Sequence, residues 1–275
     1  PAANGNGWNS ADVTITWSCT NSLSPILSGT VTQTLTAEGA AQSATGMCQD
    51  QAGNTASNTQ SGINIDKTAP TGVSLVPSGT LGNNGWYTSN VTITTTGTEA
   101  VSGPLTCTGV QSLTTDTASA TFNGSCTNLA GFTSNAAPLT LKRDATNPTI
   151  TFLNRTPANG NGWNNGDVTL NWSCTDAMSG PVDGTITQTA TAEGANQSST
   201  ATCFDNAGNS ASDTQSGINI DKTAPGIVAN RTPAANANGW NNSDVTVTFT
   251  GNDGLSGLVS CTTPVVFSAE GAGQS

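Results

Sequence analysis

The chain has 275 residues and a net charge of -11, with 6 Lys and Arg residues against 17 Asp and Glu residues, and only 8% of its residues are charged. A chain this acidic lacks the basic face that nucleic acids and anionic membranes require, so the sequence predicts neither partner. Its acids would instead attract a hard divalent cation.

One pattern of residues recurs along the whole chain, and the Trp of each Gly-Trp pair marks it: Trp8, Trp86, Trp163 and Trp240. A period of about 77 residues, kept from one marker to the next, indicates an array of small modules. The predicted modules are residues 1–70 without a first strand, 71–148, 149–225, and 226–275 without its last strands.

One predicted strand of the first module covers residues 13–19. It alternates strictly, with Val13, Ile15 and Trp17 on one face and Thr14 and Thr16 on the other. This period of two is typical of a half-buried antiparallel strand. The same strand recurs at residues 91–97, 168–174 and 245–251.

Further along each module, two Thr-rich stretches lead into an Asp-x-Ala-Gly-Asn turn at residues 50–54 and 205–209, and a return strand ends at a Pro. No window shows a helical period. Six or seven short strands in about 77 residues predict an all-β fold, a two-sheet sandwich of immunoglobulin-like type. The short Asp-Lys-Thr-Ala-Pro joint leaves few free residues between modules and predicts an extended rod.

Seven cysteines stand at recurring places, and the chain has no His and no Cys-x-x-Cys spacing. This pattern favours disulfides over zinc and predicts an extracellular, cell-surface or secreted location. Counted from each Trp, cysteines stand at positions 11 and 40 in the first and third modules and at 21 and 40 in the second. The predicted disulfides, one per module, join Cys19 to Cys48, Cys107 to Cys126 and Cys174 to Cys203.

Glycine stands where one of these cysteines is missing. Gly97 and Gly251 occupy position 11, and Gly29 and Gly184 occupy position 21. Because a disulfide needs Cα atoms about 4.4 to 6.8 Å apart, we expect positions 11, 21 and 40 to cluster, with each glycine leaving room for the sulfurs. Such loops of about 20 to 30 residues should stabilise each module by roughly 3 to 4 kcal/mol.

Cys261 has no mate at the expected spacing, which would fall beyond Ser275. Its partner is therefore expected beyond this segment or in another chain. Neither a membrane-spanning apolar run nor a secretory signal is recognisable. If the protein is exported, we expect its signal outside this segment.

The ordered motifs Gly-Trp-x-x-x-Asp/Asn-Val-Thr, Ala-Glu-Gly, Asp-x-Ala-Gly-Asn and Ile-Asp-Lys-Thr-Ala-Pro carry a resemblance. With them, the chain resembles the tandem bacterial immunoglobulin-like repeats of large extracellular surface proteins, adhesins and secreted glycan-active enzymes. The resemblance covers all 275 residues and implies a spacer or adhesive stalk. The second module departs from the motifs at residues 128–132 and 142–148.

Some repeats of this family bind calcium near module junctions, and the resemblance extends that expectation to acids of this chain. Calcium needs six to eight oxygen ligands. The candidate ligands are Asp50 with Asp66 and Asp205 with Asp221, to which Asn21 or Asp176 and backbone carbonyls could contribute. The alternative is that these acids form Asx turns and cap strand ends without metal, and no cofactor is then required. The weakest site would be in the second module, with Asn128, Glu99 and Asp144.

The Trp residues of the Gly-Trp pairs stand in Gly- and Asn-rich loops. Exposed rings could stack on sugars, and the residues concerned are Trp8, Trp86, Trp163 and Trp240. The alternative is that each ring seals one end of its module. Trp17 and Trp172, on the apolar face of a strand, are predicted to lie in the core.

The sequence argues against an enzyme, because without His it has neither a Ser-His nor a Cys-His pair. We expect a structural segment of an extracellular protein that forms a disulfide-stapled stalk, fibre or sheath, with neighbouring modules or identical chains as partners. The alternatives are an adhesin or carbohydrate-binding array, and the spacer region of a secreted glycan-active enzyme.

Overall fold

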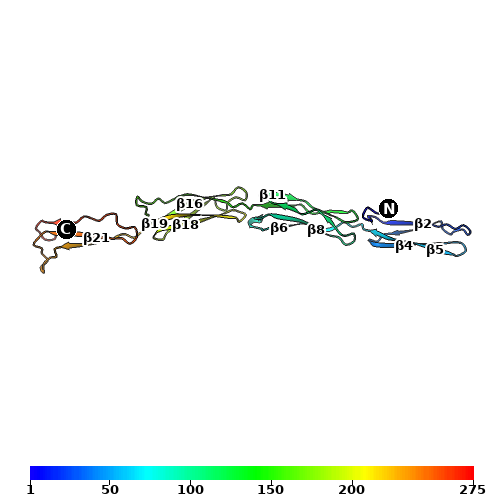
Figure 1. Cartoon of the computed structure of the whole chain (residues 1–275), viewed down its shortest axis with the longest axis horizontal. Helices are drawn as coiled ribbons and strands as arrows, with labels where there is room; N and C mark the ends of the chain where they lie inside the picture. The colour runs from blue at the N-terminus through cyan, green and yellow to red at the C-terminus, as the bar shows by residue number, and fades with distance from the viewer. The chain divides into compact units, whose positions relative to one another are not determined.

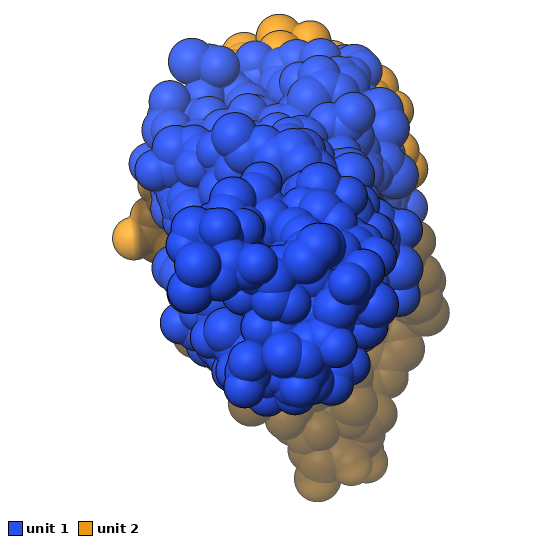
Figure 2. Space-filling model, turned by 90° about the vertical axis from the view of Figure 1, so that its right-hand side faces the viewer, with its two compact units in different colours: residues 1–146 blue, residues 147–275 orange.

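The computed structural model describes every residue, Pro1–Ser275, and divides into two compact units. Unit 1 is Pro1–Thr146 and unit 2 is Asn147–Ser275 (Figure 2). The fold is all-β, as the sequence predicts: its only helical segment is the 3-10 turn η1 (Asn83–Gly85). We call the four sequence periods repeats 1 to 4, with the boundaries predicted above.

Unit 1 contains fourteen strands, of which β4 and β5 are the longest. They are β1 (Trp8–Asn9), β2 (Val13–Ser18), β3 (Thr30–Leu35), β4 (Gly39–Gln49), β5 (Thr55–Ile65), β6 (Thr71–Ser78), β7 (Trp86–Tyr87), β8 (Val91–Thr98), β9 (Thr106–Cys107), β10 (Gln111–Leu113), β11 (Thr117–Phe122), β12 (Ser125–Thr127), β13 (Thr133–Asn135) and β14 (Leu139–Arg143). They form the sheets β1-β5-β4, β2-β3, β10-β8-β6, β11-β14-β7 and β13-β12-β9.

Unit 2 contains eight strands in three sheets. They are β15 (Thr149–Arg155), β16 (Val168–Thr175), β17 (Thr185–Ala190), β18 (Gly194–Phe204), β19 (Ser210–Ile220), β20 (Gly226–Thr232), β21 (Val245–Asn252) and β22 (Val265–Phe267). The sheets are β15-β16-β17, β18-β19 and β20-β21-β22. The pairs β4-β5 and β18-β19 are long antiparallel hairpins (Figure 1), closed at the turns that the sequence predicts.

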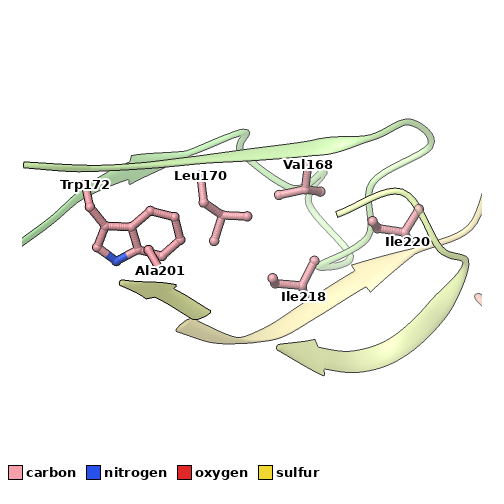
Figure 3. Close-up of a cluster of buried hydrophobic side chains, with 6 residues drawn as sticks. All are labelled: Val168, Leu170, Trp172, Ala201, Ile218 and Ile220. Carbon is pink, nitrogen blue, oxygen red and sulfur yellow. The ribbon is translucent and has the colours of Figure 1, made fainter. Parts of the chain in front are cut away.

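The core of repeat 3 lies between the sheet β15-β16-β17 and the hairpin β18-β19. Val168, Leu170 and Trp172 alternate along β16 and share one buried cluster with Ile218 and Ile220 of β19, in which the Trp172 ring lies beside Ala201 (Figure 3). These five side chains of β16 and β19 are buried, at 1% exposure or less. The ring of Phe152 meets Trp172 edge-on at 5.6 Å. Each fully buried side chain of this size contributes about 1.5 to 3 kcal/mol.

Repeat 2 has a smaller core of the same kind, centred on Val91 and Ile93 of β8 with Leu113 and Leu141 around them.

Threonines occupy the opposite faces of such strands and pair across them. The hydroxyls of Thr45 and Thr59 lie 2.8 Å apart. These cross-strand pairs satisfy hydroxyl groups without charge.

Three disulfides staple these layers. Cys19 is bonded to Cys48 and Cys174 to Cys203, with Cα atoms 6.0 and 5.8 Å apart, so each bridge joins a strand end to the facing hairpin. The bridge of repeat 2 is different, because Cys107 and Cys126 are direct partners on the neighbouring strands β9 and β12. The strand carrying position 40 is therefore bridged either from the facing sheet or from within its own sheet.

The glycines at position 11 lie against sulfur, as the sequence predicts, but those at position 21 do not. A Cβ on Gly97 would meet the Sγ of Cys126 at 3.2 Å, and one on Gly251 would meet that of Cys261 at 2.6 Å. A Cβ on Gly29 has no atom within 4 Å. Gly29 lies beside Cys19 in the strand ladder, where its carbonyl accepts from the Cys19 amide at 3.0 Å. The expectation that it makes room for the sulfurs is wrong, and Gly184 is equally open.

Repeat 4 consists of the single sheet β20-β21-β22 with no second layer over it. Apolar side chains remain exposed there, including Ile227 at 63% and Val228 at 60%. Cys261 is a free, exposed thiol.

Candidate functional site

Two oxygen-bearing side chains meet at one end of each of repeats 1 to 3. Counted from the Trp, the first stands at position 13 and the second at position 42, where the hairpin turn begins. We call them the end pair of the repeat. The end pairs are Asn21 with Asp50, Glu99 with Asn128, and Asp176 with Asp205.

The first member of each end pair stabilises its own loop by accepting hydrogen bonds from the amides of that loop. The Oδ1 atom of Asp176 accepts hydrogen bonds from the amides of Met178 and Gly180, at 3.1 and 2.8 Å. The Oδ1 atom of Asn21 likewise accepts from the amide of Leu23 at 2.9 Å. One oxygen is thus used within the loop, and the rest of the side chain is directed toward the second member.

The second member closes the hairpin turn, which explains the Asp-x-Ala-Gly-Asn motif. The Oδ1 atom of Asp205 accepts from the amides of Gly208 and Asn209 at 2.7 and 2.8 Å, and its Oδ2 atom accepts from the Asn209 side chain at 2.8 Å. Asp50 makes the same bonds with Asn54. Hydrogen bonds from the Asn54 side chain and backbone hold the pKa of Asp50 below its ordinary value.

The three end pairs differ in what joins their members. The Asn21 amide donates to the Oδ2 of Asp50 at 3.1 Å. In repeat 2 the roles are exchanged, and the Asn128 amide donates to the Oε2 of Glu99 at 2.9 Å.

In repeat 3 both members of the end pair are carboxylates. Oxygens of Asp176 and Asp205 lie within 4.8 Å of each other, and Asp205 is fully buried. Two charges at that distance repel by about 3 kcal/mol at an effective dielectric constant near 20. In repeats 1 and 2 an amide joins the two members of the end pair instead.

Within unit 1, the end pair of repeat 2 also receives the last strand of repeat 1. Asp66, directly after β5, is fully buried. Its Oδ2 atom accepts from the Asn128 amide at 2.9 Å and from the Ser102 hydroxyl, and its Oδ1 atom accepts from the Thr68 amide at 2.9 Å. The Asn128 amide also donates to the Thr68 carbonyl at 2.9 Å. These bonds fasten repeat 1 to repeat 2.

Unit 2 contains the corresponding contact between repeats 3 and 4. The Oδ2 atom of Asp221, directly after β19, accepts from the Ser256 amide at 2.9 Å. This hydrogen bonding holds the pKa of Asp221 below its ordinary value.

A Ser stands at position 16, counted from the Trp, in all four repeats: Ser24, Ser102, Ser179 and Ser256. That recurrence was the available signal for this contact, and it carried no role in the sequence analysis.

A further acid stands at position 30, counted from each Trp, and in repeats 1 to 3 it binds the segment that leaves the repeat. Glu38 accepts from the Lys67 amide at 2.6 Å and from the Thr68 hydroxyl at 2.8 Å. Glu193 makes the same two contacts with Lys222 and Thr223. The ammonium group of Lys67 binds Asp12 at 2.9 Å. The joint between repeats is thus anchored to the body of the preceding repeat.

The structure separates the acid pairs that the sequence analysis grouped as calcium ligands, but it brings Asp176 and Asp205 of the same candidate set together. Asp50 precedes β5 and Asp66 follows it, so this eleven-residue strand separates them by roughly 36 Å. Asp205 and Asp221 lie at opposite ends of β19 for the same reason. The pairs Asp50 with Asp66 and Asp205 with Asp221 do not form, because their members lie at the two ends of one strand. Asp205 instead meets Asp176, and Asp66 meets Asn128.

Two of the four Trp side chains proposed to stack on sugars are buried. Trp8 and Trp86 are each 8% exposed. Trp8 sits on a short strand that pairs in parallel with β5, and the Lys142 ammonium lies 5.0 Å from the ring centre of Trp86. These rings seal their repeats and offer no face for stacking. Trp163 is half-buried, and Trp240 is 56% exposed beside the open sheet of repeat 4.

No family model matches the chain, and no curated protein matches it. Among solved structures, one similar chain is described as "Ca2+-stabilized adhesin helps an Antarctic bacterium reach out and bind ice". The two chains are 15% identical with a TM-score of 0.30, and the match covers 92% of this chain and 81% of the other. No helix in the structure combines the length and the apolar character needed to cross a membrane.

Proposed function

We propose that this chain is a structural segment of an extracellular protein, in which immunoglobulin-like sandwiches follow one another as a disulfide-stapled stalk, fibre or sheath. The observation that carries the proposal is the recurring joint within each unit. Asp66 is held by Ser102 and Asn128, and Asp221 is held by Ser256. A joint held by hydrogen bonds, which are buried between repeats 1 and 2 and partly buried between repeats 3 and 4, resists bending, as a spacer requires. The disulfides match an oxidising compartment.

Small-angle scattering of the full chain tests the proposed arrangement. A compact globule of this length has a radius of gyration of about 19 Å. Each eleven-residue hairpin strand spans about 36 Å, so four repeats end to end measure roughly 140 Å and give a radius of about 40 Å. We expect the larger radius. A radius at the globular value would overturn the rod.

A sugar-binding array receives less support from the site. Its proposed platforms in repeats 1 and 2, Trp8 and Trp86, are buried. A repeated binding function would need the same exposed face in each repeat. The structural role is therefore the function that we propose.

We propose in addition that repeat 3 binds Ca²⁺ between Asp176 and Asp205. The two carboxylates converge, and neither can donate to the other as the amides of the other end pairs do. Calcium accepts carboxylate and carbonyl oxygens in flexible arrangements and would offset the repulsion. Each carboxylate already holds backbone amides of its own loop, so the ion would join the loop to the hairpin turn.

The test of this site is Asp176→Asn, which recreates the Asn-Asp pair of repeat 1. We expect wild type to melt higher in Ca²⁺ than in chelator, since a ligand at 100 times its Kd stabilises by about 2.7 kcal/mol. Asp176→Asn should lose the calcium response and stay folded in chelator. Asp183→Asn, an exposed acid of the same repeat, is the matched control and should keep the response. If the melting temperature of wild type is the same in Ca²⁺ and in chelator, the proposed calcium site is excluded.

A further inference from the structure

The side-chain amide of Asn128 has more oxygen acceptors than an amide can satisfy. Three oxygens surround its nitrogen at 2.9 Å each: Oδ2 of Asp66, Oε2 of Glu99 and the carbonyl of Thr68. An amide nitrogen carries only two N–H groups. Two carboxylates and a carbonyl around one point are instead the ligand set of a hard cation.

We propose that the amide nitrogen of Asn128 takes the place of a divalent cation in the joint between repeats 1 and 2, so that this joint holds without metal. The proposal deepens the structural function proposed above, since it says which joint of the stalk is independent of calcium. It also identifies Asn128 as the residue that decides this property.

Burial strengthens the effect of the Asn128 amide in place of a cation. Asn128 is 3% exposed and Asp66 is fully buried, so water cannot separate the carboxylates of Asp66 and Glu99. The pKa of Glu99 lies below its ordinary value: burial raises it, but hydrogen bonds from the Val101 amide and from Asn128 outweigh that effect. Donors thus hold the Glu99 carboxylate ionised, as a cation would otherwise do.

A second, independent observation is a compensating change four residues further on. In repeats 1 and 3 the hairpin turn ends with Asn54 or Asn209, whose side-chain amide donates to the Oδ2 atom of Asp50 or Asp205. In repeat 2 that position is Phe132. An amide there would face another donor, the Asn128 nitrogen, so loss of the donor accompanies the exchange of Asp for Asn.

The other member of the end pair changes as well. Asn21 donates to a carboxylate in repeat 1, whereas Glu99 accepts from an amide in repeat 2. The two repeats thus reach the same result, one amide between the members of the pair, from opposite sides. Replacing Asn128 by Asp would leave Asp66, Glu99 and the new carboxylate around one point without the amide that now joins them.

The test is Asn128→Asp in the full chain carrying Asp176→Asn, which silences the site proposed in repeat 3. We expect the parent to bind no Ca²⁺ here and to melt alike in Ca²⁺ and chelator. Asn128→Asp should add one Ca²⁺ per chain by calorimetry and melt lower in chelator than in Ca²⁺ by about 4 °C or more. Because repeat 3 is silenced, failure of its site leaves this outcome unaffected.

A rescue variant covers the case in which Asn128→Asp does not fold in chelator. Adding Glu99→Gln returns one amide to the end pair, now from the side that Asn21 uses in repeat 1. The double variant should regain stability in chelator and lose the added ion. The proposal is overturned if Asn128→Asp gains no Ca²⁺, if it melts alike in chelator and Ca²⁺, or if Glu99→Gln fails to restore it in chelator.

Discussion

Gly97 of β8 lies directly against the sulfur of Cys126, so that a methyl group at residue 97 would approach that sulfur to 3.2 Å. It would also meet Val73 and Leu105 at 3.2 and 3.3 Å. The glycine is part of the packing around the disulfide of repeat 2.

Gly97→Ala is therefore expected to destabilise repeat 2. Overpacking a tight core costs about 1 to 3 kcal/mol, which exceeds the roughly 0.4 to 1 kcal/mol gained when Ala replaces Gly at an unstrained position. Gly184→Ala is the matched control, because its Cβ meets open space. Thermal melts of the two variants measure the difference. Equal melting temperatures would contradict the packing seen here.

Trp172 anchors the core of repeat 3, and its indole nitrogen donates to the Oδ2 of Asp213 at 2.7 Å. Trp172→Ala should cost about 3 to 5 kcal/mol in free energy of unfolding. Asp213→Asn should cost under about 1 kcal/mol, since Asn58 accepts the same bond from Trp17 in repeat 1. Denaturant unfolding of each variant gives both numbers. A large loss in Asp213→Asn would show that the charge itself is needed.

The disulfides should contribute a large share of the stability of each repeat. Removing Cys174–Cys203, which closes a separation of 29 residues, should cost about 3 to 4 kcal/mol. The paired replacement Cys174→Ala with Cys203→Ala should lower the melting temperature of repeat 3, and reductant should have no further effect on that repeat. Cys261→Ser is the control and should leave the melting temperature unchanged, because this thiol is free.

Acid should destabilise the protein through carboxylates that are hydrogen-bonded in the folded state. At Asp116 burial raises the pKa, but hydrogen bonds from Thr146 and Ala145 and the charge of Arg143 outweigh it and lower the pKa. The unfolded chain then binds more protons, so stability is complete above the ordinary pKa of about 3.9 and is lost as the pH falls through the lower folded value.

Melting temperature measured from neutral pH down to acid tests this sign. The wild-type value should fall steeply once the pH drops below about 4. Asp116→Asn should start lower at neutral pH, because Arg143 loses its partner at 2.6 Å, and should show a shallower acid limb. An acid limb as steep as that of wild type would exclude Asp116 as a contributor.

The strands of this fold were accessible from sequence because local signals specify them. The alternation that begins at Val13 and recurs at Val168 predicts β2 and β16, and the Asp-x-Ala-Gly-Asn turn predicts the hairpin β18-β19. Each of these signals lies within a short stretch of chain. Trp17 and Trp172 fall in the core for the same reason.

The end pairs were accessible only in part, because they join residues that are far apart in the sequence and lie on different strands. Glu99 and Asn128, and likewise Asp176 and Asp205, stood among the candidate ligands, but nothing in the sequence showed that they meet as pairs. Asn21 stands at the same place in its repeat as Glu99 and Asp176, but its contact with Asp50 is visible only in the fold. Asp66 was grouped with the wrong partner, since proximity was read along one strand and the true contacts lie in the next repeat. Position-by-position comparison of the repeats, applied to Ser102 and its counterparts, could have found them.

The small number of basic side chains affects how readily trypsin-like proteases can cleave this chain. Five of the six are held in place: Lys67 and Lys222 bind Asp12 and Asp167, Lys142 covers Trp86, Arg143 binds Asp116, and Arg155 binds the Ser216 carbonyl. A trypsin-like endoprotease needs an extended, accessible segment around a Lys or Arg. The chain has only six Lys and Arg residues in 275, and most of them are tied to folded strands. It should therefore persist where such proteases are abundant.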